Sequence, residues 1–307
     1  MNAPIVVFVY NRADHAKGLL RSLAQCRMAK ESDLYIFSDG AKNEAGAQKV
    51  AEVREYINSR EVAEAFQTVT VTEAPKNRGV DKSVIAGVDT VICRYGKVIV
   101  VEDDNTVSKD FLEFMNGALD YYENNPGIWA IGGYTLPIRI PEDYTCDVFR
   151  MGRGSSYAWA TWLDRWEKVD WTMPDYPAFR KDRKQRKAFD RFGNDRSAML
   201  EGQYCTGEYT WDISFSFHAF KYEKGFVLPT KGRVKNNGND GSGTHVSGKD
   251  TRFDTVMQPD HPPVKFEDVS IDERLRREVV RIFNRSFSVR CKQRIKKLLT
   301  AVGVKVK

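Results

Sequence analysis

Three adjacent carboxylates, Glu102, Asp103 and Asp104, directly follow an apolar run at residues 97–101. An uninterrupted apolar run of this length is typical of a strand covered on both faces, so the acids would stand at the end of that strand. Their mutual repulsion is costly unless a cation or hydrogen-bond donors offset it. Mg²⁺ and Mn²⁺ take oxygen ligands, often one or two carboxylates together with phosphates and water. The triplet therefore predicts a divalent metal, Mn²⁺ or Mg²⁺, held against a diphosphate.

Such a site suits sugar transfer from a nucleotide sugar. The departing nucleoside diphosphate gains negative charge on its oxygens, and a metal ion acts on that charge as a Lewis acid. The alternative for the triplet is structural, because three acids can also form a surface turn or cap a helix that begins near Ser108.

Strands and helices alternate through the first hundred residues. Helical stripes such as Val84, Val88 and Val91 separate the apolar or β-branched runs, and these runs lie at residues 5–10, 34–37, 68–72 and 97–101. This order predicts an α/β fold with a mostly parallel sheet flanked by helices, whose ligands gather at the carboxyl ends of the strands. The loops expected to converge there are 10–14, 38–43, 73–82 and 102–106.

The regular alternation fades after residue 112, which divides the chain into three expected parts. Residues 1–112 form the donor-binding half. Residues 113–265 form a less regular acceptor-binding and catalytic half, which holds all six tryptophans. Residues 266–307 form a basic, amphipathic, helical tail.

Charge and cysteine content exclude several classes of protein. The net charge is +6, from 48 Lys and Arg against 42 Asp and Glu. Nine of the basic residues and none of the acids lie in residues 281–307, so the rest sums to 39 minus 42, or −3. A weakly acidic body argues against nucleic-acid binding. The five cysteines are scattered and odd in number, which favours free thiols over disulfides or a zinc site.

Membrane and targeting signals are weak in this sequence. No stretch approaches the roughly 20 apolar residues of a membrane-spanning helix, and no signal-peptide pattern opens the chain. We therefore expect a cytoplasmic protein. The tail interleaves basic and apolar residues, which favours peripheral attachment to the anionic inner face of the cytoplasmic membrane. The alternative is a basic helix packed on the body.

The surroundings of the triplet resemble a known family. Residues 100–111, with the sequence VVEDDNTVSKDF, resemble the strand, metal motif and helix start of the Golgi N-acetylglucosaminyltransferase I family, inverting enzymes of the GT-A fold. The opening strand followed by Asn11 and Arg12, and the turn Ser38-Asp39-Gly40, agree in order with the same family. Bacterial family 2 glycosyltransferases share much of this layout. The resemblance covers residues 4–112 well and 128–235 loosely.

The resemblance implies roles for individual residues. Arg12 would contact the diphosphate, Asp39 would read the uracil edge, Asp103 would lie near the ribose and Asp104 would bind the metal directly. The other residues expected at the donor site lie on the converging loops or beside the metal ligand, and they are Tyr10, Asn77, Arg78, Lys82 and Glu102. Two alternatives stay open: Arg12 as a solvated loop charge, and Asp39 as a residue that merely favours its turn.

An inverting transfer also needs a carboxylate that takes the proton of the attacking hydroxyl. Asp212 follows Trp211 at the start of an apolar helix, and this pair resembles the Trp-Asp-Asp segment that includes the base of the Golgi family. Only one aspartate follows the tryptophan here, so Glu208 is the second candidate. The structural alternative for Asp212 is a helix N-cap.

Two further segments are candidates for ligand contacts. Residues 154–162 resemble the glycine and tryptophan segment between donor and acceptor, where Trp159 would stack on a sugar ring. Core packing is the alternative, because Trp159, Trp162 and Trp166 are spaced for one helical face. His245 lies in a long polar stretch of the kind that forms lids, and there it would reach the metal or diphosphate. The alternative is a solvated loop histidine.

Together these features predict a metal-dependent, inverting glycosyltransferase. It would move a sugar from a UDP-sugar onto a hydroxyl of a glycan or lipid-linked glycan, in bacterial surface polysaccharide assembly. Two other functions remain open: a nucleotidyltransferase acting on sugar phosphates, which would release pyrophosphate, and a non-catalytic glycan-binding module of the same fold.

Overall fold

The computed structural model describes residues 1–207, 210–238 and 251–284. The candidates Glu208 and His245, and the tail from residue 285 onward, lie outside the described residues. The strands are β1 (Ile5–Val9), β2 (Asp33–Ser38), β3 (Thr68–Glu73), β4 (Lys97–Glu102), β5 (Asn105–Val107), β6 (Ile128–Gly132), β7 (Val148–Met151), β8 (Ala158–Trp162), β9 (Gly225–Pro229) and β10 (Val234–Asn236). The α-helices are α1 (Ala13–Ala24), α2 (Glu44–Ile57), α3 (Arg60–Ala63), α4 (Val80–Tyr95), α5 (Phe111–Tyr122), α6 (Leu163–Trp166), α7 (Tyr176–Lys181), α8 (Arg183–Phe189), α9 (Arg196–Thr206), α10 (Trp211–Lys221) and α11 (Glu273–Phe283).

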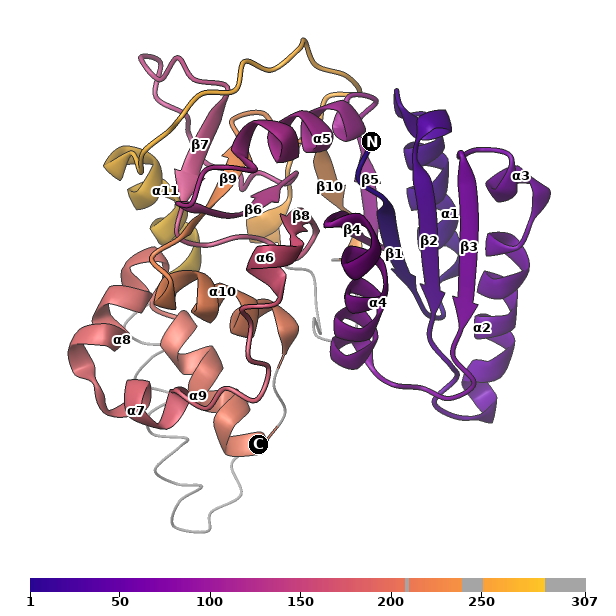
Figure 1. The fold of residues 1–307 in the computed structure, drawn as a ribbon, viewed down its shortest axis with the longest axis horizontal. Helices are drawn as coiled ribbons and strands as arrows, with labels where there is room; N and C mark the ends of the chain where they lie inside the picture. Colours follow the sequence, from indigo (N-terminus) through magenta and orange to yellow (C-terminus); the bar gives the residue numbers. More distant parts are fainter. Residues whose placement is uncertain (208–209, 239–250, 285–307) are drawn as a thin grey trace.

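Eight strands form one sheet in the order β3-β2-β1-β4-β8-β6-β9-β7. The strands β3, β2, β1 and β4 run parallel, as the alternation of strands and helices predicts. Antiparallel pairing begins where β8 joins β4, and the later strands mix both directions. The α/β fold class is therefore confirmed, and the sheet continues from the predicted donor half into the predicted acceptor half (Figure 1).

Helices cover both faces of the sheet because each strand of the centre is apolar on both sides. In β1, Ile5 and Val7 pack toward α1, α2 and α5, whereas Val6 and Phe8 pack toward α4, α6 and α10. Strands buried on both faces produce continuous apolar runs rather than an alternating pattern. The polar loops at the strand ends are thus the places in this half where ligands have access.

A short two-stranded ribbon, β5 with β10, lies beside the end of β4. A buried polar cluster holds it: the carboxylate of Asp110 accepts hydrogen bonds from Arg233 Nε at 3.0 Å, His261 Nδ1 at 2.9 Å and Ser108 Oγ at 2.7 Å. Buried polar groups are stable only when they are paired in this way. The cluster joins three distant segments and fixes the entry of β10 next to the acidic triplet.

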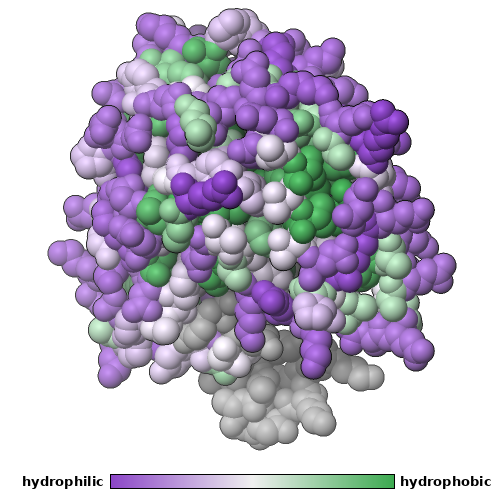
Figure 2. Space-filling model, turned by 45° about the vertical axis from the view of Figure 1, so that its right-hand side comes forward, coloured by the Kyte–Doolittle hydropathy of each residue, from purple (hydrophilic) through white to green (hydrophobic). Residues whose placement is uncertain are grey.

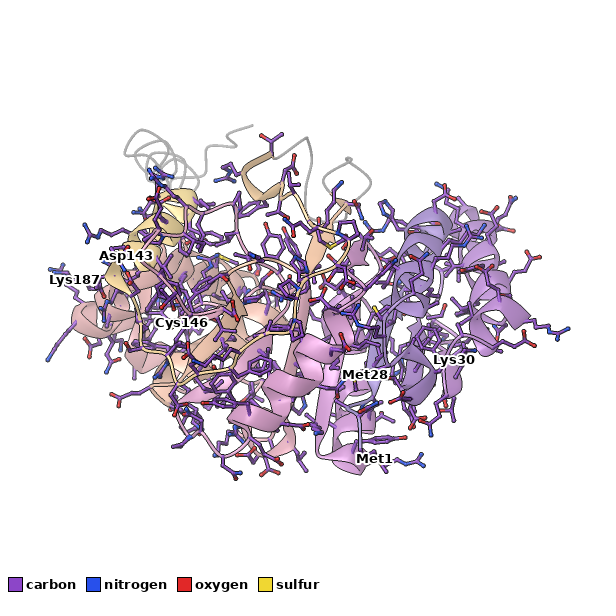
Figure 3. All side chains as sticks on the ribbon, turned by 90° about the horizontal axis from the view of Figure 1, so that it is seen from above. Met1, Met28, Lys30, Asp143, Cys146 and Lys187 are labelled. Atoms are coloured by element: carbon purple, nitrogen blue, oxygen red, sulfur yellow. The ribbon has the colours of Figure 1, made fainter. Side chains whose placement is uncertain are left out.

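The C-terminal segment crosses the second half of the molecule on its way to α11. Figure 3 shows Asp143 and Cys146 on the side of the molecule where this segment runs. Arg274 of α11 pairs with Asp143 at 2.6 Å, and Leu275 and Val279 are buried against Phe149. The part of the predicted tail up to residue 284 is therefore packed on the body.

Within the described ranges, no helix is both long and apolar enough to cross a membrane. The face in Figure 2 is mainly hydrophilic, with its largest hydrophobic area right of the centre and smaller ones elsewhere.

Trp159, Trp162 and Trp166 do not share one helical face, although their spacing in the sequence fits one. Trp159 and Trp162 lie in β8, on opposite faces of the sheet, and only Trp166 lies in a helix.

Candidate functional site

The predicted donor residues converge at the carboxyl ends of the parallel strands. Arg12 follows β1, Asp39 follows β2, Asn77 lies between β3 and α4, and Asp103 and Asp104 follow β4. Neighbouring parallel strands end at the same edge of the sheet, so these loops meet. The convergence expected from the order of elements is present.

Arg12 lies between two of the three acids. Its guanidinium donates to Asp103 and, at 3.0 Å, to Asp104. The side chain of Arg12 is 19% exposed and that of Asp103 7%, so the group is largely shielded from water. Arg12 is therefore not a solvated loop charge. Its Nη1 is buried and has no hydrogen-bond partner among the described residues.

Burial and mutual repulsion disturb the titration of the acids. Burial, followed by the charges of Asp104, Asp212 and Asp103, raises the pKa of Glu102 well above its usual range. Burial also raises the pKa of Asp103 from 3.8 to about 6, although Arg12 acts in the opposite direction. A buried carboxylate prefers its neutral form until a cation comes near. The cluster thus holds more negative charge than one arginine offsets.

Residues 236–238, at the end of β10, contact Asp104. Asn236 Nδ2 donates to Asp104 Oδ1 at 2.9 Å, and the backbone N–H of Asn237 donates to the Asp104 carbonyl at 2.7 Å. A Cβ on Gly238 would come within 2.3 Å of Asp104 Oδ2, so only glycine fits there without a shift. In the sequence, Asn236, Asn237 and Gly238 are marked only by the polar stretch in which they lie. The triplet is followed by β5 rather than by a helix, so its acids do not cap α5.

Asp39 holds the loop between β3 and α4. Its carboxylate accepts four hydrogen bonds at 2.8–3.0 Å, from the backbone N–H groups of Gly40, Arg78 and Gly79 and from Asn77 Nδ2. A carboxylate offers about four lone-pair sites, so all are occupied. Asp39 therefore does more than favour its own turn, and a uracil N–H would have to displace one of these donors. The uracil contact stays a prediction.

Gly40 and Arg54 complete this turn. A Cβ on Gly40 would lie 2.4 Å from the carbonyl carbon of Lys76, so the two backbones approach too closely for any side chain. Arg54 of α2 donates to Ser38 Oγ at 3.2 Å and to the Ala74 carbonyl at 2.7 Å, joining the ends of β2 and β3. Arg54 carried no sequence signal beyond an ordinary helix-surface charge.

The other predicted donor residues are Tyr10, Arg78 and Lys82. The hydroxyl of Tyr10 accepts the backbone N–H of Lys42 at 3.2 Å. The side chains of Arg78 and Lys82 are exposed. Over the ranges that the structure describes, no three His, Cys, Asp or Glu side chains form a ready metal cage. A metal here would take its remaining ligands from phosphate, water or the undescribed loop that carries His245.

Asp212 stands in the first turn of α10, near the acidic triplet. Its charge contributes to the raised pKa of Glu102, which places the two carboxyl groups close to each other. Thr210, not Asp212, is the N-cap residue, and its hydroxyl donates to Asp212 Oδ1 at 2.7 Å. The backbone N–H of Trp211 donates to Asp81 Oδ1 at 2.8 Å. Asp81 of α4 thereby fixes the start of α10. The sequence does not mark this role of Asp81, because an acid in the first turn of a helix is common.

Two adjoining cavities open beside Asp212. The Arg196 cavity, of about 60 Å³, and the Phe283 cavity, of about 150 Å³, share the lining residues Arg153, Gly154, Ser155, Ser156 and Asp212. Gly154, Ser155 and Ser156 belong to the predicted segment between donor and acceptor, residues 154–162. The arrangement offers a carboxylate at the edge of a space that can receive another molecule.

Trp159 belongs mainly to the core. It is 3% exposed and lies against Trp211 and Trp166, with ring centroids 5.0 and 5.7 Å apart. It also lines the Arg196 cavity, where its indole N–H is buried and has no acceptor among the described residues. Because its faces are covered by other rings, the expected stacking on a sugar is not available to it in this conformation.

Replacing Asp39 tests how firmly the loop is held. Asp39→Asn substitutes an NH₂ group for one carboxylate oxygen, so this group faces backbone N–H donors. The substitution should lower the free energy of unfolding by about 1–3 kcal/mol. Amide hydrogen exchange at Arg78 and Gly79 should also become faster. Asp182→Asn is the control, because Asp182 caps α8 through a single oxygen and asparagine caps equally well. Equal losses in the two variants would contradict the role assigned to Asp39.

The raised pKa of Asp103 predicts a pH dependence of stability without metal. Folded Asp103 keeps its proton up to about pH 6, whereas the unfolded carboxyl loses it nearer 3.8. The free energy of unfolding should therefore fall as the pH rises from about 4 to about 6, by at most about 1.4 kcal/mol per pH unit. Denaturant unfolding should show wild type losing stability relative to Asp103→Asn across this range.

Asp272→Asn is the control for that titration. The hydrogen bond from the Arg274 side chain lowers the pKa of Asp272 to about 2, so the contribution of Asp272 to stability is nearly complete at about pH 4 and does not fall as the pH rises further. A wild type that gains stability relative to Asp103→Asn as pH rises would show that Arg12 outweighs burial, and would contradict the assignment.

Comparison with known proteins supports the resemblance seen in the sequence. Residues 1–136 match the model of the GNT-I family. No significant match was found among curated proteins. Two solved structures of S. aureus TarS are similar at 13% and 14% identity, with TM-scores of 0.43 and 0.45 and with 76% and 78% of this chain covered. The chain spans 36% and 62% of those two TarS chains.

A third similar structure is the mannosyltransferase PcManGT from Pyrobaculum calidifontis in complex with GDP-Man and Mn²⁺. It is 12% identical, with a TM-score of 0.41, and the similarity covers 72% of this chain and 69% of that one. The match of residues 1–136 confirms the resemblance of this part of the chain to glycosyltransferases of the GNT-I family.

Proposed function

We propose that this protein is a metal-dependent, inverting glycosyltransferase that uses a UDP-sugar. The observation that carries the proposal is the convergence of three carboxylates and Arg12 at the end of β4. The match of residues 1–136 to the GNT-I family agrees with it. The acceptor would be a hydroxyl of a glycan or lipid-linked glycan.

The residues at the end of β4 fit a divalent cation with a diphosphate. Glu102 and Asp103 have raised pKa values because of burial and neighbouring charge, and a cation relieves both causes. Asp104 would hold the metal, with His245 as a further ligand from outside the described residues. When bound, Mn²⁺ or Mg²⁺ supplies Lewis acidity toward the leaving diphosphate. Arg12, whose Nη1 has no partner among the described residues, would bind a phosphate oxygen.

Asp212 is proposed as the base on the acceptor side. The acceptor oxygen attacks the anomeric carbon as the bond from that carbon to the diphosphate oxygen breaks, and the nucleoside diphosphate leaves with the electron pair. Asp212 takes the proton from the attacking hydroxyl. Its place beside both cavities and near Glu102 supports this assignment. Glu208 remains the alternative.

The finer roles rest on sequence features. We further propose that the enzyme acts in bacterial surface polysaccharide assembly, and that the interleaved basic and apolar residues of segment 285–307 attach it to an anionic membrane. The nucleotidyltransferase alternative shares the metal site but would release pyrophosphate rather than UDP. Measuring the released nucleotide separates the two.

Asp104→Asn tests the donor site. UDP with Mn²⁺ should raise the thermal midpoint of the wild type more than UDP alone, since a ligand at about 100 times its Kd stabilises the native state by about 2.7 kcal/mol. The variant should lose the part of the shift that depends on Mn²⁺, because the direct metal ligand is gone. Asp182→Asn, far from the site in α8, should keep the full shift. An undiminished Mn²⁺ effect in Asp104→Asn would sink the assignment.

Asp212→Asn tests the base. With the UDP-sugar that gives the highest UDP release, the variant should release UDP at least about 100-fold more slowly, because a general base contributes about that much or more. Its affinity for UDP and Mn²⁺ should match that of wild type. Glu208→Gln should stay within a few-fold of wild type. The reverse pattern, with Glu208→Gln inactive and Asp212→Asn active, would move the base to Glu208.

A further inference from the structure

Arg196 is a fully buried cation at the wall of the Arg196 cavity. It is 1% exposed and begins helix α9. Burial, followed by the charge of Arg153, lowers the pKa of Arg196 to about 9, so the side chain is still protonated at neutral pH. A buried charge without compensation is costly, and such groups are usually paired with an opposite charge.

The hydrogen bonds of Arg196 go to neutral acceptors. Its Nη1 donates to the Phe189 carbonyl at 2.9 Å and its Nη2 to Ser216 Oγ at 2.6 Å, which are both neutral acceptors. Its Nε is buried and finds no acceptor in the described part of the chain. The guanidinium carbon lies 3.8 Å from the centre of the Phe189 ring. No carboxylate within the described ranges is hydrogen-bonded to it.

The nearby carboxylates stabilise the charge of Arg196 through space but make no hydrogen bond to it in the described part of the chain. Arg153, which also lines the cavity, forms a two-bond ion pair with Asp195 at 2.7 and 2.9 Å, so that carboxylate is occupied. Asp190 and Asp195 act on Arg196 only through longer-range charge, and Asp190 accepts the backbone N–H of Ser197 at 2.8 Å. Asp212 at the edge of the cavity is engaged with Thr210.

A second donor on the same cavity also lacks a partner. Trp159 lines the cavity, and its indole N–H is buried without an acceptor in the part that the structure describes. The hydroxyls of Ser155 and Ser156 belong to the same wall. Buried N–H groups are rarely left unsatisfied. Two of them beside one cavity, one on a cation, call for a ligand that brings acceptor oxygens and negative charge.

We infer that the Arg196 cavity binds an oxyanion, a phosphate or a carboxylate, that is carried by the acceptor. The assignment to the acceptor rests on the function proposed above, because the cavity is lined by Asp212 and by none of Arg12 and the three acids of the donor site. Its volume of about 60 Å³ suits one such group rather than a whole sugar. The enzyme would then select anionic glycans over neutral ones.

Inorganic phosphate and acetate are the probes for this site. Calorimetric titration of the full chain should show that at least one of them binds, and Arg196→Gln should weaken the binding about tenfold or more, through loss of a charged hydrogen bond. Arg150→Gln is the matched control. Arg150 Nε is also buried without a partner among the described residues, but Arg150 lines neither cavity. The Arg150→Gln variant should bind phosphate and acetate as wild type does.

Two further variants decide the remaining outcomes. Arg12→Gln should bind phosphate and acetate as wild type does. Loss of binding in Arg12→Gln would place the anion at the donor site and overturn the inference. A wild-type protein that binds neither probe would also overturn it. If Arg196→Gln does not fold, Asp212→Asn decides. Removing the carboxylate from the cavity wall should tighten anion binding several-fold, and unchanged affinity would overturn the inference.

These results are independent of the test of the donor site. A chain that loses its Mn²⁺ effect in Asp104→Asn yet binds no anion keeps the proposed function and loses only the inference. A chain that binds anions at Arg196 but shows no metal-dependent UDP binding keeps the anion site and loses the proposed function.

Discussion

The repulsion among buried carboxylates at the end of β4 is the constraint on which the site depends. Burial raises the pKa values of Glu102 and Asp103, and Arg12 is the cation that the described structure places against them. Three acids and one arginine leave an excess of negative charge in a shielded place. A protein that gains nothing from this arrangement has no reason to keep it, since neutral residues would be more stable there. The excess supports the proposal of a divalent cation at this site.

The surrounding loops exist to keep these charges in place. Asp39 uses its whole carboxylate to hold the loop before α4, and Asn236 and Asn237 bind the side chain and backbone of Asp104. Asp81 ties the start of α10 to the donor half. Each contact joins segments that are far apart in the sequence, so residues from both halves of the chain meet around the ends of the parallel strands.

The sequence was sufficient for the features that depend on local pattern. An apolar run followed by acids predicts a strand end, and the alternation of runs predicts that Arg12, Asp39 and Asp104 meet. It could not reveal that Asn236 covers Asp104, because pairing across more than a hundred residues leaves no local trace. The tryptophans of β8 were ambiguous for a physical reason: a strand apolar on both faces has no alternation, so its spacing also fits a helix. The unpaired Arg196 was invisible for a similar reason, since burial depends on the packed fold.

A crystal structure of the protein with UDP and Mn²⁺ tests the central claim most directly. Our account predicts the metal on Asp104, the diphosphate between the metal and Arg12, and the nucleoside along the ends of β1 and β2. A nucleotide bound elsewhere, with Arg12 still joined to Asp103 and Asp104 and no metal beside them, would contradict it.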